Sequence, residues 1–205
     1  LHFDYYSARL ALVSNSAMTS NREQTATRIT QCALDLAEER GLDGFTMDDL
    51  AKCAGVSRRT LFNYVEGKMD AVLGAPTAPD PERLKEFRAG GPTGRMSTDI
   101  KGVITALLDS KNFKPDELDR LHRLIASDAR LHKALHDKFA RFADFLAVAL
   151  QERGNGQLSE LQARAAATAT LSLFDISLKA FVDDPTTSLA DHFVAAFDGA
   201  AAIFA

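Results

Sequence analysis

The stretch of sequence that decides the fold runs from Phe45 to Lys68 and reads FTMDDLAKCAGVSRRTLFNYVEGK. It predicts two short helices joined by a tight turn. Thr46 suits the N-cap of the first helix, and Asp49, three residues on, completes an acidic variant of the capping box. Gly55 can adopt the positive φ that a sharp turn between helices requires. This layout is typical of a helix-turn-helix.

The second of these helices has an apolar side and a basic side. It begins at its N-cap, Ser57, and turns Leu61 and Val65 inward one helical turn apart. The other side carries Arg58, Arg59, Thr60 and Asn63. In a helix-turn-helix such residues meet base edges in the major groove, where Arg can donate twice to guanine and Asn can pair with adenine. We interpret this side as a DNA-reading face, against two alternatives: plain helix packing and an ordinary solvated basic surface.

The segment resembles the DNA-binding domain of the tetracycline-repressor (TetR) family of bacterial transcription regulators. The matching positions are Thr46, Leu50, Ala51, Ala54-Gly55-Val56-Ser57, Thr60-Leu61, Tyr64 and Lys68. With the first helix included the match is specific, whereas beyond Lys68 the resemblance is only of size and helical character. It implies a homodimer that binds a palindromic operator.

The residues and the resemblance together assign DNA contacts to one set of side chains. This set is Thr46, Ser57, Arg58, Arg59, Thr60, Asn63, Tyr64 and Lys68. We expect Arg58 and Arg59 at base edges. We expect Thr46, Tyr64 and Lys68 at phosphates, because a helix N-terminus with a Lys beside it attracts anions.

The chain departs from the family pattern at four positions of this segment. Arg59 stands where the family usually has Gly, and Phe62 replaces Tyr. Val65 replaces Phe, and Gly67 replaces a Ser or Asn N-cap. None of these changes removes the motif, but they make the operator sequence of any relative unsafe to transfer.

Length and composition are those of an ordinary globular protein. The chain has 205 residues, enough for one or two domains with a sizeable core, and a formal net charge of −4. An acidic total does not prevent DNA binding where the basic residues are local. We expect the two cysteines, Cys32 and Cys53, to be small apolar fillers in a reducing cytoplasm, with a redox or metal role as the alternative.

The beginning of the chain does not follow the pattern of the rest. Met18 stands where a regulator of this type would naturally start, so we expect residues 1–17 to be a non-native upstream extension. The apolar run from Leu10 to Val13 is too short for a signal-peptide core. A docked arm that packs Phe3, Tyr5 and Tyr6 is the alternative.

The patterns predict an all-α protein with an N-terminal three-helix helix-turn-helix domain and a C-terminal helical ligand-binding and dimerisation domain. The expected divisions are an extension at 1–20, the DNA-binding domain at 21–73, a linker with a short helix at 74–94, and the helical domain at 95–205. The first helix spans 22–40 and ends at Gly41. Later helices are expected near 95–110, 116–127, 129–153, 157–183 and 187–203.

The stretch from Ala165 to Phe174 carries no charge on any helix face. Its length is about half of a membrane span, so we expect no membrane insertion. We expect this helix to be buried almost all round, on one side by its own core and on the other by a second chain. The last helix adds an apolar face made of Phe193, Val194, Phe197, Ala200, Ala201 and Phe204. A four-helix homodimer interface is predicted, and a monomer's own core is the alternative.

A ligand pocket is expected among the C-terminal helices, with a wall suited to a small apolar or aromatic effector. Its candidate residues are Leu107, Leu108, Leu124, Phe139, Phe142, Phe145, Leu146, Phe174 and Phe181. Ordinary core packing is the alternative for them. His132 and His136 share a helix face, but no Cys or acidic partner accompanies them, so we expect no metal and no cofactor.

The sequence carries no phosphate loop, GxSxG, HExxH or CxxC motif, so an enzyme is not expected. The leading hypothesis is a cytoplasmic, ligand-responsive repressor. The alternatives are an architectural DNA-binding protein without an effector, and a small-molecule-binding protein that no longer reads DNA.

Overall fold

The computed structural model describes residues 16–74, 79–110 and 114–204, and these residues form helices and connecting turns without a strand. The predicted all-α fold class is confirmed. The proposed extension at residues 1–17 and the aromatic residues within it lie almost entirely outside the described residues. The chain divides into two compact units, one from residues 1–76 with 123–134 and one from residues 77–122 with 135–205.

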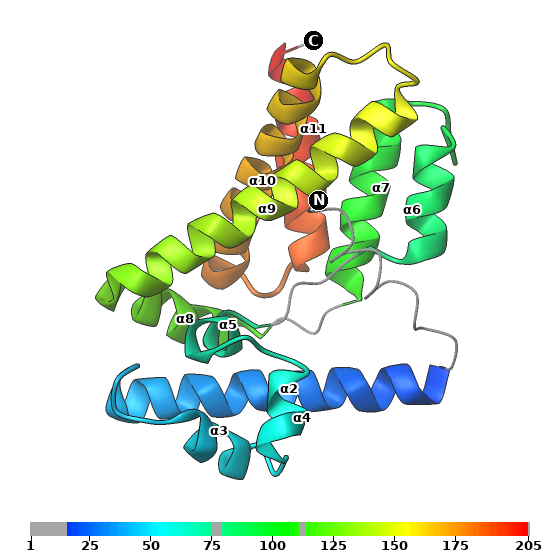
Figure 1. The fold of residues 1–205 in the computed structure, drawn as a ribbon. Helices are drawn as coiled ribbons and strands as arrows, with labels where there is room; N and C mark the ends of the chain where they lie inside the picture. The colour runs from blue at the N-terminus through cyan, green and yellow to red at the C-terminus, as the bar shows by residue number, and fades with distance from the viewer. Residues whose placement is uncertain (1–15, 75–78, 111–113, 205) are drawn as a thin grey trace. The chain divides into compact units, whose positions relative to one another are not determined.

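The first unit contains the helix-turn-helix (Figure 1). Its helices are α2 (Ser16–Arg40), α3 (Met47–Cys53), α4 (Arg58–Phe62) and α5 (Lys68–Leu73). The predicted apolar stripe of α2, namely Ile29, Ala33, Leu36 and Ala37, is buried. Leu50 of α3 and Leu61 of α4 are fully buried. Gly41 and Gly55 both have positive φ, at 70° and 61°, and so make the two turns that only a residue without a Cβ makes cheaply.

Helix α4 is shorter than its pattern suggests. It ends at Phe62 after five residues, and Asn63 is its C-cap. The chain still turns back tightly, because the Val65 amide donates to the Leu61 carbonyl at 3.1 Å. Leu61 and Val65 are both buried, so their predicted inward orientation is confirmed.

The two cysteines are not the isolated fillers that the sequence predicts. Cys32 on α2 and Cys53 at the end of α3 are joined by a disulfide. Their separation of 21 positions carries no local signal, and only the packing of α3 against α2 brings the two residues together.

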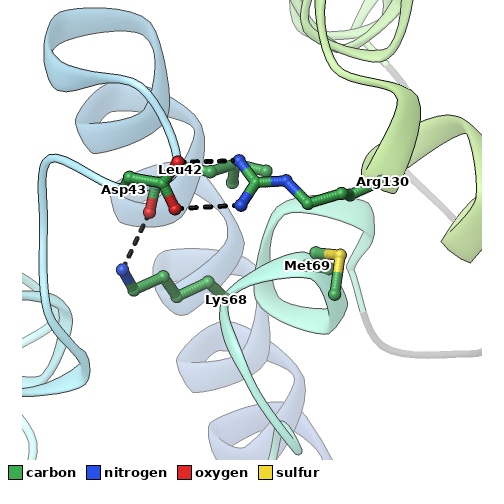
Figure 2. Close-up of a pocket in the computed structure, with 5 residues that line it drawn as sticks. All are labelled: Leu42, Asp43, Lys68, Met69 and Arg130. Atoms are coloured by element: carbon green, nitrogen blue, oxygen red, sulfur yellow. Dashed lines mark hydrogen bonds and ion pairs between the residues drawn. The ribbon is translucent and has the colours of Figure 1, made fainter.

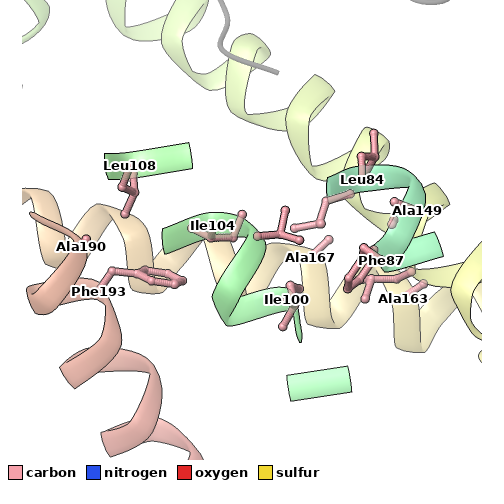
Figure 3. Packing of buried hydrophobic residues seen from close by; sticks show 14 of the residues in the cluster. Leu84, Phe87, Ile100, Ile104, Leu108, Ala149, Ala163, Ala167, Ala190 and Phe193 are labelled. Carbon is pink, nitrogen blue, oxygen red and sulfur yellow. The ribbon is translucent and has the colours of Figure 1, made fainter. Parts of the chain in front are cut away.

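The second unit is built around one hydrophobic cluster (Figure 3). Its helices include α6 (Pro81–Arg88), α7 (Met96–Asp109), α10 (Glu160–Asp183) and α11 (Leu189–Phe204). Helices α8 (Pro115–Ser127) and α9 (Ala129–Arg153) each run from one unit into the other. Leu84 and Phe87 of α6 belong to this cluster. The short helix expected at 74–94 is α6, and its two large apolar side chains face inward into this core.

A buried arginine fastens the turn between α6 and α7. The Arg153 guanidinium donates to the carbonyls of Phe87, Gly90 and Gly91 at 2.8–2.9 Å and to the Asp99 carboxylate. Burial opposes ionisation of Asp99, but hydrogen bonds from Thr93 and from Arg153 outweigh it and hold the Asp99 pKa below its usual value. A buried pair of this kind costs little only when every polar atom is satisfied. Among the described residues no buried side-chain nitrogen or oxygen lacks a partner.

Helix α10 is covered on one side only. Its buried residues are Ala163, Ala167, Thr170, Ser177 and Phe181. Burial of one side by the chain's own helices agrees with the expectation for Ala165 to Phe174, and cover of the other side by a second chain stays a prediction. Of the described helices, α10 alone has the length and composition of a membrane-crossing helix, with a mean hydropathy of 1.4 and 22% of its most apolar window buried.

Candidate nucleic-acid interface

The loop before α3 is fixed by a reciprocal cap. The Thr46 hydroxyl accepts from the Asp49 amide at 3.1 Å, and the Thr46 amide donates to the Asp49 carboxylate at 2.8 Å. The capping box predicted from the sequence is confirmed. Hydrogen bonds from the Thr46 hydroxyl and amide lower the pKa of Asp49. Thr46 thus orients the start of α3, and its hydroxyl lies at an exposed surface.

The N-terminus of α4 is capped by Ser57. Its hydroxyl accepts from the Thr60 amide at 3.0 Å and lies 2.8 Å from the Thr60 hydroxyl. The predicted N-cap is confirmed. Ser57 and Thr60, which we assign to DNA contact, therefore form one polar group at the end of α4, where unpaired amides favour an anion.

The two arginines of α4 differ in their surroundings. The Arg58 guanidinium lies 3.2 Å from the Asp48 carboxylate of α3 and 5.7 Å from the centre of the Phe62 ring. Arg59 is exposed and makes no ion pair or hydrogen bond with any residue that the structure describes. Arg59 is therefore free to meet a base edge, whereas Arg58 must leave Asp48 first.

Asn63 and Tyr64 follow directly after α4. Asn63 is exposed and Tyr64 is half-buried. The Arg22 guanidinium of α2 lies 5.7 Å from the centre of the Tyr64 ring. Arg22 is a basic residue beside the predicted contact set that sequence reasoning missed, because the match to the family pattern in α2 has no signal at this position.

Lys68 faces the loop between α2 and α3 instead of open solvent (Figure 2). Its amine donates to the Leu42 carbonyl at 2.8 Å and lies 4.9 Å from the centre of the Phe45 ring. The start of α5 has Gly67 as its N-cap, as predicted, and no side-chain cap. Lys68 therefore stabilises this corner in the free protein, and a phosphate contact would compete with the Leu42 carbonyl.

Two arginines pair the corner between α8 and α9 with the end of α2 and the loop that follows it. Arg130 donates to both carboxylate oxygens of Asp43, at 2.9 and 3.0 Å (Figure 2). It also donates to Asp128 at 2.7 Å. The Arg130 side chain and its backbone amide lower the pKa of Asp128 to about 2, and Arg130 also lowers the pKa of Asp43. Arg123 adds a longer ion pair to Glu38 at 3.5 Å. These pairs link residues 85 and 87 positions apart.

Two open cavities flank this corner. One, of 230 Å³, is lined by Leu42, Asp43, Lys68, Met69 and Arg130. The other, of 290 Å³, includes Leu124 among its lining residues. Leu124 is the one predicted pocket residue that lines either cavity.

The other predicted pocket residues lie in or beside the core of the second unit. Phe181, Leu108 and Leu146 are buried, and Phe142, Phe145 and Phe174 pack partly buried against them. Leu107 and Phe139 are half-buried. The Phe139 and Phe174 rings meet edge to face, with their centroids 6.3 Å apart. The structure thus brings these phenylalanines together as a packed layer, which is the arrangement that the core alternative predicts.

His132 and His136, the candidate metal pair, are both exposed on α9. Within the described part of the chain, no group of three or more His, Cys, Asp or Glu side chains could hold a metal ion.

Comparison with known proteins agrees with the helix-turn-helix geometry. Residues 29–70 match the sequence model of the family described as bacterial regulatory proteins, tetR family. The chain is 24% identical over 189 residues to a Mycobacterium tuberculosis protein named as a mycofactocin biosynthesis transcriptional regulator, MftR; the alignment covers 89% of this chain and 92% of that protein.

Solved structures that the chain resembles include transcriptional repressors. A complex of SmeT, described as the repressor of a Stenotrophomonas maltophilia multidrug efflux pump, has 15% identity and a TM-score of 0.50, covering 88% of this chain and 91% of that chain. Thermus thermophilus FadR, a TetR-family repressor in complex with lauroyl-CoA, has 20% identity and a TM-score of 0.47, covering 84% and 91%. From the matched segment and the folded helix-turn-helix, residues 29–70 form a DNA-binding domain of the tetR type, and the chain as a whole is similar to transcriptional regulators of that family.

Proposed function

We propose that this regulator is a homodimeric repressor that binds a palindromic operator and is released by a small apolar or aromatic effector. The observation that carries the DNA-reading part is the exposed basic side of α4. There Arg59 has no partner among the described residues, and Ser57, Thr60 and Asn63 surround it with polar groups. Arg59 and Arg58 read base edges, while Thr46, Tyr64 and Lys68 contact phosphates.

The homodimer is supported by the outer side of α10. Exposed residues recur along it at helical spacing: Leu161, Ala165, Ala169, Ser172 and Ile176. Leu161 is 78% exposed and Ile176 is 59% exposed. Small residues between two large apolar ones let a second helix approach closely, and a contiguous apolar surface of this kind is typical of an interface.

Helix α11 contributes less of its predicted apolar face than expected, because Phe193 is buried in the chain's own core and Phe197 packs against that core. It packs beside α10 in the second unit, and its Ile203 is 79% exposed. Ala195, Gly199 and Ala202 are exposed along the same helix. Two helices from each of two chains would form a four-helix interface. A two-fold dimer presents its recognition helices to two half-sites about one DNA turn apart, which fits a palindromic operator.

Release by an effector requires a path from the second unit to α4. We place this path in α8 and α9, because each helix has residues in both units and Arg130 of α9 pairs with Asp43 in the loop after α2. SmeT, which has a similar fold, was solved in complex with triclosan, so a fold of this type can hold a small molecule. An effector that binds the non-reading state better by a few kcal/mol, about 10²–10⁴-fold, would release the operator.

Selection from a randomised pool of DNA duplexes at near-physiological salt tests this proposal. The expected result is enrichment of an inverted repeat, because two α4 helices read two half-sites. Retention of unselected DNA, or of none, would contradict sequence-specific binding by a dimer. With the enriched operator in hand, a screen of apolar and aromatic compounds for release of labelled DNA tests the effector, and reporter transcription from that operator separates repression from activation.

A further inference from the structure

The disulfide between Cys32 and Cys53 lies within the DNA-reading unit. Their Cα atoms are 5.9 Å apart, which is within the range of unstrained disulfides. The bond connects α2, the long helix on which the unit is built, to the last residue of α3. Since the chain has only these two cysteines, no other thiol of the same chain can exchange with them.

The two sulfur-bearing residues differ in access to solvent. Cys53 is exposed at the end of α3, whereas Cys32 is only 8% exposed on α2. A reagent from solution therefore meets Cys53 first. The Cys32 sulfur is close enough to attack the modified Cys53 sulfur and to release the reagent. This arrangement favours a disulfide within the chain over one between chains.

We propose that Cys32 and Cys53 form a reversible thiol–disulfide site, oxidised by a peroxide or a small-molecule disulfide, that fastens α3 to α2. With hydrogen peroxide, the Cys53 thiolate attacks one oxygen, the O–O bond breaks, and a sulfenic acid and the first water form. Cys32 then attacks that sulfur, the S–S bond forms, and the second water leaves. With a small disulfide, two exchange steps release two small thiols. A thiol reductant reverses either reaction.

The position of the bond connects it to DNA reading. Asp48, on α3, holds Arg58 of α4 by an ion pair at 3.2 Å, so the placement of α3 affects the first turn of α4. In the oxidised chain the helix-turn-helix is intact, with both caps formed. The Arg58 pair itself has to open on DNA, but by fastening α3 to α2 the bond keeps the capped helix-turn-helix folded, and oxidation is therefore expected to raise operator retention. This last consequence rests on the proposed operator binding, whereas the chemistry of the site does not.

The test begins with full-length protein that has been reduced and freed of reductant. One sample receives hydrogen peroxide and another receives oxidised glutathione, and intact mass is measured before and after fresh reductant. The expected result in both samples is a single covalent chain, two hydrogens lighter than the reduced protein and without a free thiol. Fresh reductant should return the mass of the reduced chain. The melting temperature of the oxidised form should rise by about 5–10 °C, because the cross-link restricts the unfolded chain.

Two matched variants separate the roles of the cysteines. Cys53→Ser, at an exposed position, should fold normally and leave Cys32 slow to react with a maleimide. Cys32→Ala should leave Cys53 open, so that it collects a glutathione adduct or an oxygen atom without losing two hydrogens. Two thiols that stay free under both oxidants, a cross-link between chains, or a persistent adduct on the native chain would each overturn the proposal. If the cross-link forms but neither form binds selected DNA, the proposed function fails and the thiol site stands.

Discussion

Helices α4 and α10 each leave one side exposed in the single chain, but one of these sides is basic and polar and the other is apolar. Helix α4 has five residues, and its outer side is basic and polar. Helix α10 has 24 residues, and its outer side is aliphatic and small, with Leu161 and Ile176 largely exposed. Polar groups that are hydrated lose little by staying exposed, whereas apolar surface gains free energy when a partner covers it.

The difference indicates two kinds of partner. The basic side of α4 suits a polyanion, with an attraction that depends on salt. The outer side of α10 suits a second apolar surface, whose association is insensitive to salt. The proposed regulator needs both partners, because a second chain bound at α10 would let two copies of α4 bind one DNA molecule.

The largest expected effect comes from placing a charge on the α10 surface. In Ile176→Asp the carboxylate would be buried against the second chain without a cation, so the dimer should dissociate. Operator affinity should then fall by about 100-fold or more, since the second half-site no longer binds within the same molecule. Light scattering after size exclusion measures the mass, and fluorescence anisotropy measures the affinity.

The matched control is Ala140→Asp, which adds the same charge at an exposed position of α9. It should leave both the mass and the affinity unchanged. A native chain that is monomeric at the concentrations of DNA binding, or an Ile176→Asp variant that stays dimeric, would contradict the assignment of α10 as the interface.

A smaller effect is expected from the arginines of α4. Arg59→Ala should cost about 1–3 kcal/mol of operator binding and relax base preference at one position of each half-site. Arg58→Ala should cost less, because Arg58 gives up its ion pair with Asp48 when it moves to DNA. Affinities for the operator and for single-base variants measure both quantities. Equal losses in the two variants, with unchanged base preference, would show that both arginines contact phosphates.

Much of this reading side could be predicted because its signals are local. Thr46 with Asp49, and Ser57 with Thr60, are three positions apart and fixed by one turn of helix. The two glycine turns follow from single residues. The third N-cap, Gly67, also follows from its position before α5.

The features that the sequence did not predict join distant residues. Cys32 and Cys53 are 21 positions apart, Arg153 and Phe87 are 66 apart, and Arg130 and Asp43 are 87 apart. No periodicity connects such positions. The uncharged stretch of α10 has a different standing: its inner side is buried as expected, whereas the cover of its outer side by a second chain stays a prediction.

An effect on DNA affinity similar in size to that of the α4 arginines is expected at Lys68, and it distinguishes two roles for this residue. If its amine leaves the Leu42 carbonyl to bind phosphate, Lys68→Ala should weaken all DNA sequences alike. The slope of log affinity against log salt should become shallower by about 0.9 per subunit, or about 1.8 for the dimer. If Lys68 only fastens the α2–α3 loop, the slope should stay constant while thermal stability falls by about 1 kcal/mol. Titrations at several salt concentrations, with a thermal melt of the free protein, separate the two outcomes.

The smallest effect is expected at the exposed ion pairs of Arg130. The pKa of Asp128 is lowered from 3.8 to about 2 in the folded chain, so its pairing stabilises the fold fully above about pH 4. This contribution should be lost as the pH falls through 3.8 toward 2, because the unfolded chain binds its proton first. Asp128→Asn keeps a side chain that can cap α9 but removes the charge, and should reduce the loss of stability over this pH range. Far-UV circular dichroism during acid titration measures it.

The control is the same substitution in an Arg130→Gln background, which lacks the guanidinium whose hydrogen bond is the largest single cause of the shift. There Asp128→Asn should add almost no further change, because the two residues act through one interaction. Equal effects of Asp128→Asn in both backgrounds would mean that the backbone amides, and not the guanidinium, lower this pKa. Together the four proteins measure how much the charge pair of Arg130 and Asp128 stabilises the corner between α8 and α9. That corner is stabilised within the chain, whereas the outer sides of α4 and α10 are proposed to be covered by DNA and by a second chain.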